Sequence, residues 1–95
     1  MAWIKNLNTL RDFLSLVVVH APDDFPREDD LSDDEQLNLE RAFAELHAGL
    51  RFLPVDRQMT RLRTLLDEAL AAYRSGNDVE GAHALQSFET EAFSA

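Results

Sequence analysis

The sequence predicts an all-α fold, a small four-helix bundle-like domain with a C-terminal antiparallel helical hairpin. Apolar residues recur at the i, i+3 and i+4 spacing of amphipathic helices through most of the chain. Pro22, Pro26, Pro54 and Gly76 stand between these stretches. A chain of 95 residues with 45% hydrophobic residues forms one core. We therefore expect a single domain over 1–95. Its helices lie near 3–20, 33–53, 56–75 and 78–93, with an acidic connection over 22–31.

The first helix follows from one apolar stripe. Its members share helical spacing: Trp3, Leu7, Leu10, Leu14, Val17 and Ala21. The β-branched run 17–19 leaves open whether this part is helix or a short strand. Leu16 and Val19 project away from the stripe, and Pro22 helps to end the helix.

The second helix is predicted to begin at a capping box, in which the Ser32 hydroxyl and the Glu35 carboxylate satisfy early backbone N–H groups. Its buried stripe follows a 4-3-4-3 spacing: Leu39, Phe43, Leu46, Leu50 and Leu53. Leu37 and Phe52 project from the opposite side. A helix that is apolar all round is central in its domain or covered by another chain.

The last two helices are joined by a short turn and are expected to form the hairpin. Asp56 is a plausible N-cap of the third helix, and Gly76 is suited to end it. Asn77 or Asp78 begins the fourth helix. The small residues at 81, 82 and 84 would let this helix approach the third one closely.

Charge is unevenly distributed along this chain of formal net charge −9. Residues 21–40 contain nine acidic side chains and one basic side chain, Arg27. Such a surface repels the phosphates of nucleic acids and anionic lipids. No segment approaches the ~20 apolar residues of a membrane span. We expect a cytoplasmic protein that binds neither nucleic acid nor membrane.

The acidic connection does not match a calcium-binding EF-hand loop. A twelve-residue loop that begins at Asp24 ends at Glu35, but Pro26 takes the third position and Asp29 replaces the required glycine at the sixth. No dedicated metal site is therefore predicted, and a weak, irregular cation site remains open.

The remaining polar motifs do not predict catalysis. Glu80 and His83 have the Glu-x-x-His spacing of di-iron bundles, but those sites need the motif twice, and His83 projects toward solvent. His20 near acidic residues fits a favourable contact with a helix end. With no cysteine, no glycine-rich phosphate loop and no nucleophile elbow, we expect no catalytic residue and no cofactor.

Surface character then gives two hypotheses about function. The candidate partner-binding residues are acidic or apolar: Asp23, Asp24, Glu28, Asp29, Asp30, Leu16, Val19, Leu37 and Phe52. The first hypothesis is a non-catalytic protein-binding module that neutralises or regulates a basic protein partner. In size and charge the chain resembles bacterial immunity proteins and antitoxins. The alternative is a structural or regulatory homo-oligomer, a dimer that associates through its first two helices.

Overall fold

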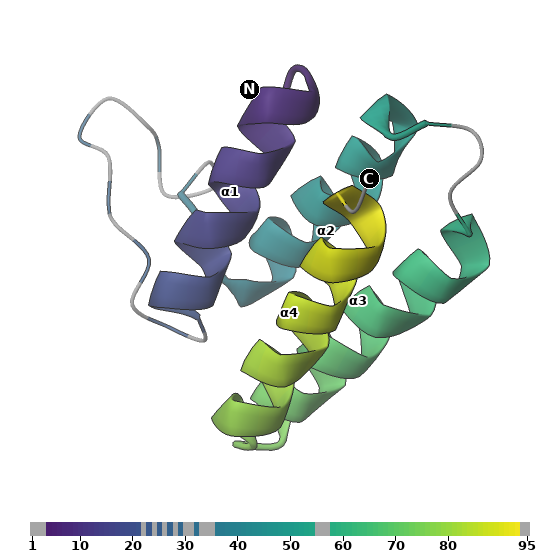
Figure 1. Cartoon of the computed structure of the whole chain (residues 1–95). Helices are drawn as coiled ribbons and strands as arrows, with labels where there is room; N and C mark the ends of the chain where they lie inside the picture. Colours follow the sequence, from purple (N-terminus) through teal and green to yellow (C-terminus); the bar gives the residue numbers. More distant parts are fainter. Residues whose placement is uncertain are drawn as a thin grey trace.

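The all-α fold class is confirmed in a computed structural model of the chain (Figure 1). The structure describes residues 4–21, 23, 25, 27, 29, 32, 36–54 and 58–93. Within these ranges it contains four α-helices, a 3₁₀ helix and no strand: α1 (Leu7–His20), α2 (Leu39–Gly49), η2 (Leu50–Phe52), α3 (Met59–Arg74) and α4 (Asp78–Phe93).

The first helix begins at Leu7, not at residue 3 as predicted. The reason is a capping box that the apolar stripe does not reveal. The Asn6 side chain accepts the Thr9 N–H at 2.9 Å, and the Thr9 hydroxyl accepts the Asn6 N–H at 2.9 Å. Residues 17–19 are helical, because Val17 continues the buried stripe and is 0% exposed. Trp3 lies outside the described residues.

The predicted start of the second helix is wrong. Ser32 and residues 36–38 are not helical, and α2 begins at Leu39. Its N-cap is Asn38, whose side chain accepts the Arg41 N–H at 2.8 Å. Gln36 and Leu37 are each only 8% exposed, so the stretch before the cap packs against the bundle. Residues 33–35 lie outside the described ranges, and η2 extends the element to Phe52, close to the predicted end.

The third helix begins at Met59, three residues later than predicted. Its N-cap is Gln58, and Asp56 lies outside the described residues. The helix ends in a Schellman motif. Gly76 adopts φ 81° and donates its N–H to the Tyr73 carbonyl, while Asn77 donates to the Ala72 carbonyl. The fourth helix has the predicted bounds, Asp78–Phe93.

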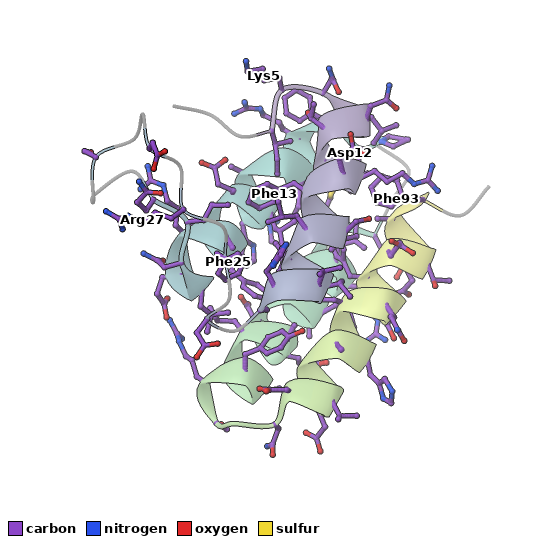
Figure 2. All side chains as sticks on the ribbon, turned by 90° about the vertical axis from the view of Figure 1, so that its left-hand side faces the viewer. Lys5, Asp12, Phe13, Phe25, Arg27 and Phe93 are labelled. Atoms are coloured by element: carbon purple, nitrogen blue, oxygen red, sulfur yellow. The ribbon has the colours of Figure 1, made fainter. Side chains whose placement is uncertain are left out.

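Helices α3 and α4 form the most extensive contact of the bundle and lie side by side in Figures 1 and 2. Arg61 near the start of α3 pairs with Glu91 near the end of α4, with 3.1 Å between Nε and Oε2. At the other end, a Cβ added to Gly81 would lie 2.7 Å from Cε2 of Tyr73. The two helices therefore run in opposite directions, and the missing side chain at Gly81 permits the close approach expected from the sequence.

The core is assembled from all four α-helices. Its largest fully buried side chains are apolar: Leu10, Leu14, Val17, Phe43, Leu46, Leu62, Leu66, Leu85 and Phe88. Between α2 and α3 the rings of Phe43 and Tyr73 pack with centroids 6.2 Å apart.

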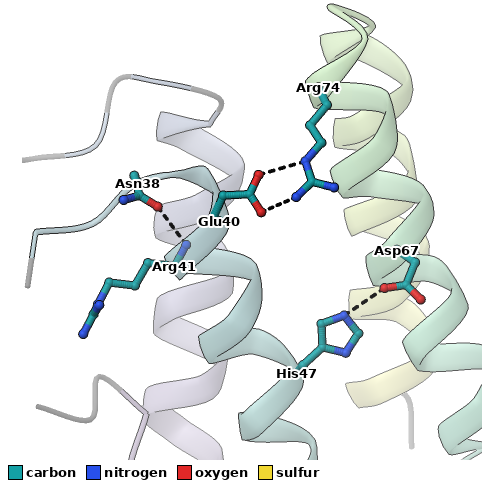
Figure 3. Close-up of polar contacts among 6 residues, drawn as sticks. All are labelled: Asn38, Glu40, Arg41, His47, Asp67 and Arg74. Carbon is teal, nitrogen blue, oxygen red and sulfur yellow. Dashed lines mark hydrogen bonds and ion pairs between the residues drawn. The ribbon is translucent and has the colours of Figure 1, made fainter. Parts of the chain in front are cut away.

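Polar contacts flank this packing between α2 and α3 on the surface (Figure 3). Arg74 binds Glu40 through two guanidinium nitrogens, and Nε2 of His47 lies 3.1 Å from Oδ1 of Asp67. Because the four side chains are a third or more exposed, the two pairs contribute little to the stability of the fold.

Candidate functional site

The segment between α1 and α2, residues 21–38, contains the acidic connection. None of its described residues lies in a helix or strand. In Figure 1 the described part of this segment lies beside α1, away from the α3–α4 pair.

The described side chains of the acidic connection differ in burial. Asp23, Arg27 and Asp29 are exposed, whereas Phe25 is half-buried and packs against the hydrophobic core (Figure 2). Phe25 thus attaches the connection to the bundle, while Asp23 and Asp29 face solvent. Asp24, Glu28 and Asp30 lie outside the described residues.

The exposed carboxylates of the connection differ from several on the helices. Glu40, Asp67 and Glu91 each pair with a basic side chain. Asp23 and Asp29 have no ion-pair partner among the described residues. Their full charge is therefore available to a ligand.

The four apolar candidates have different surroundings. Val19 is 72% exposed at the end of α1, whereas Leu16 is half-buried against the core. Leu37 precedes α2 and is buried, so its predicted place on an open face of that helix is wrong. Phe52 is half-buried, and the Arg51 guanidinium lies 4.7 Å from the centroid of its ring. Val19 is the one largely exposed residue in this set of four.

Sequence reasoning missed two residues that shape this region. Phe25 is an isolated aromatic residue between Pro22 and Pro26. Its apolar character within an acidic stretch could have indicated that it packs against the core. Asn38 was concealed by the stronger capping pattern at Ser32. Together they determine where the connection leaves and rejoins the bundle.

The histidines do not gather into a metal-binding group in the part of the chain that the structure describes. No group of three or more His, Cys, Asp or Glu side chains there could hold a metal ion. His83 is exposed, as predicted, and lines an open hollow with Arg61 and Ser87. His20 is the last residue of α1, and its Nδ1 is buried with no hydrogen-bond partner among the described residues.

Among the described residues, no helix has both the length and the apolar character needed to cross a membrane. No protein-family model matches the chain, and no curated protein or solved structure matches it either.

Proposed function

We propose that this protein is a non-catalytic, acidic protein-binding module that neutralises or regulates a basic protein partner in the cytoplasm, in the manner of immunity proteins and antitoxins. The observation that carries the proposal is the acidic connection. Asp23 and Asp29 are exposed and unpaired among the described residues, within a segment, 21–38, that holds eight acidic side chains and one basic side chain.

The distribution of charge favours a partner that is a protein with a basic surface. A dense group of exposed carboxylates accelerates the encounter with a cationic protein and repels anionic polymers. At physiological ionic strength screening acts over ~8 Å, so the connection acts mainly on charges that face it directly. The acids therefore supply association rate and specificity.

Affinity requires apolar contact beside the charges. Val19 presents a largely exposed side chain two residues before the segment begins, and Phe25 holds the connection against the bundle. An anchored connection loses less conformational freedom on binding than a free one, which favours complex formation. Val19 with the neighbouring carboxylates forms the proposed contact surface.

The alternative hypothesis, a homo-oligomer formed through the first two helices, has less support. It relied on apolar side chains that extend around both helices. Leu37 is a core residue, and Leu16 and Phe52 pack against the core. Among the described residues the large exposed hydrophobic side chains are Leu7, Val19 and Val79, which are scattered over α1 and α4. Scattered single residues of this kind are not the contiguous apolar patch that a dimer interface without complementary charges needs.

The test begins with affinity capture from the cells in which the chain is made, to identify the partner. Association and dissociation rates are then measured at several salt concentrations for Asp23→Asn/Asp29→Asn. We expect association at low salt to slow by about two- to tenfold with a flatter salt dependence, because long-range attraction is reduced. Dissociation should change little.

A matched control replaces two exposed acids on the helices, Glu68→Gln/Glu80→Gln, and changes the net charge by the same amount. This variant should keep most of the parent's association rate. If both double variants slow association equally, only net charge matters and the connection is not the binding surface. A captured partner without a basic surface contradicts the proposal as a whole.

A further inference from the structure

A second surface lies where α2 ends and α3 begins. It is a hollow of about 240 Å³ lined by basic and apolar side chains: His47, Ala48, Leu50, Arg51, Met59 and Arg63. Among the described residues, no acidic side chain lines it. In a chain of net charge −9, such a local group of cationic side chains is unexpected. In Figure 1 the end of α2 and the start of α3 lie on the opposite side of α1 from the described part of the acidic connection.

The two arginines of the hollow are suited to bind an anion. The Arg51 guanidinium lies over the Phe52 ring at 4.7 Å, a cation–π contact that restrains its position. Arg63 is exposed and has no ion-pair partner among the described residues. Guanidinium groups bind carboxylate or phosphate through paired hydrogen bonds.

His47 adds a third polar group. Its Nε2 lies 3.1 Å from Oδ1 of Asp67, so Nδ1 is the ring atom left for a ligand (Figure 3). Asp67 contacts the histidine without lining the hollow. The first turn of α3 also begins here with Met59, and Gln58 makes no side-chain cap, so the positive end of the helix dipole adds to the arginines.

The apolar lining restricts the ligand further. Ala48, Leu50 and Met59 supply carbon surface next to the charged groups. Pockets for drug-sized ligands span roughly 300–1,000 Å³, so this hollow fits something smaller. We propose that it binds a small molecule with one anionic group, phosphate or carboxylate, attached to a compact apolar body. This inference is independent of the basic-partner proposal.

The inference is tested by titrating the isotope-labelled protein with phenyl phosphate and following its NMR spectrum. We expect saturable shifts confined to His47, Met59 and the Nε–H signals of Arg51 and Arg63. Inorganic phosphate should bind more weakly, because it lacks the apolar body, and benzyl alcohol should not bind. The same titration with benzoate distinguishes a carboxylate ligand from a phosphate ligand. The anionic group that suits the hollow better should give the tighter binding.

Variants separate a built site from general attraction to arginine. Arg51→Gln and Arg63→Gln should each weaken phenyl phosphate binding by roughly tenfold or more, the loss expected for a hydrogen bond to a charged group. The control is Arg11→Gln. Arg11 also lies over an aromatic ring, Phe93, at 5.1 Å, but its hollow includes Glu89. This variant should bind as the parent does.

Three outcomes overturn the inference. Shifts that do not saturate, or that appear equally at Arg11, indicate general ion attraction. Equal affinities for phenyl phosphate and inorganic phosphate show that the apolar lining does not contribute to binding. Shifts of the hollow residues that depend only on protein concentration show that a second copy of the chain occupies the hollow.

Discussion

The close approach of α3 and α4 predicts that Gly81→Ala destabilises the protein, although alanine is the better helix former. The added Cβ would lie 2.7 Å from Cε2 of Tyr73 and 2.8 Å from its Cδ2 and Cζ. The ring has little room to move, because Tyr73 is only 5% exposed and packs against Phe43. The helices or the ring must shift to accept the methyl group.

The magnitude follows from two opposing terms. Forcing one extra carbon into a packed core costs about 1–3 kcal/mol. Alanine in place of glycine in a helix interior gains about 0.5–1 kcal/mol. The steric term is larger, so we expect a net loss of about 1 kcal/mol in the free energy of unfolding. For a domain of this size the midpoint of thermal unfolding falls by roughly 4–8 °C.

The assay is urea unfolding followed by far-UV circular dichroism, with the thermal midpoint as a second measure. Ser87, which is exposed on α4, provides the control. Comparing Ser87→Gly with Ser87→Ala measures the intrinsic preference of this helix for alanine without a steric neighbour. Alanine should be favoured there by about 1 kcal/mol.

A double-mutant cycle with Tyr73→Leu tests the cause. Without the ring, Gly81→Ala should be neutral or stabilising, with a coupling energy in the range of ~0.5–3 kcal/mol expected for residues in contact. The reasoning is refuted if Gly81→Ala alone stabilises the protein as much as alanine does at position 87. That result would mean that α4 does not approach the Tyr73 ring.

Two further predictions concern a helix cap and a buried phenol. Asn38→Ala should lower the free energy of unfolding in urea by about 1 kcal/mol, because the Arg41 N–H loses its acceptor. The control, Asn8→Ala at an exposed position within α1, should change that free energy by less than ~0.5 kcal/mol. Equal losses in the two variants would show that α2 does not begin at Leu39. Burial raises the pKa of Tyr73 above 10.0, and the charge of Asp78 adds to this effect. The folded protein therefore holds the phenol proton more tightly than the unfolded chain. Its contribution to stability is complete below pH 10 and is lost as the pH rises further. In Tyr73→Phe the free energy of unfolding should fall less steeply as the pH rises above 10. If parent and variant lose stability equally at alkaline pH, the phenol is not buried.

The candidate sites illustrate how far sequence reasoning extends. The exposed acids at 23 and 29 followed from composition, because charged side chains in a stretch with Pro22 and Pro26 have no means of burial. The basic hollow could not be predicted in the same way. Its residues come from three elements, and none of these segments shows a binding pattern on its own. Only the packing of α2 and η2 against α3 brings His47 and Arg51 close to Arg63.

Local signals alone determined the bounds of α4 and the end of α3, because a glycine that accepts positive φ stops one helix and the acidic residues after it start the next. The helical spacing of Leu10, Leu14 and Val17 left open whether residues 17–19 are helix or strand, and the burial of Val17 in the folded core decided for helix. The start of α2 was decided by tertiary structure. Ser32 and Asn38 are both suitable caps, and the free energy of a cap, about 1 kcal/mol, is smaller than that of burying a leucine, about 1.5–3 kcal/mol. The burial of Leu37 in the core favours the later start, and burial depends on helices distant in the sequence.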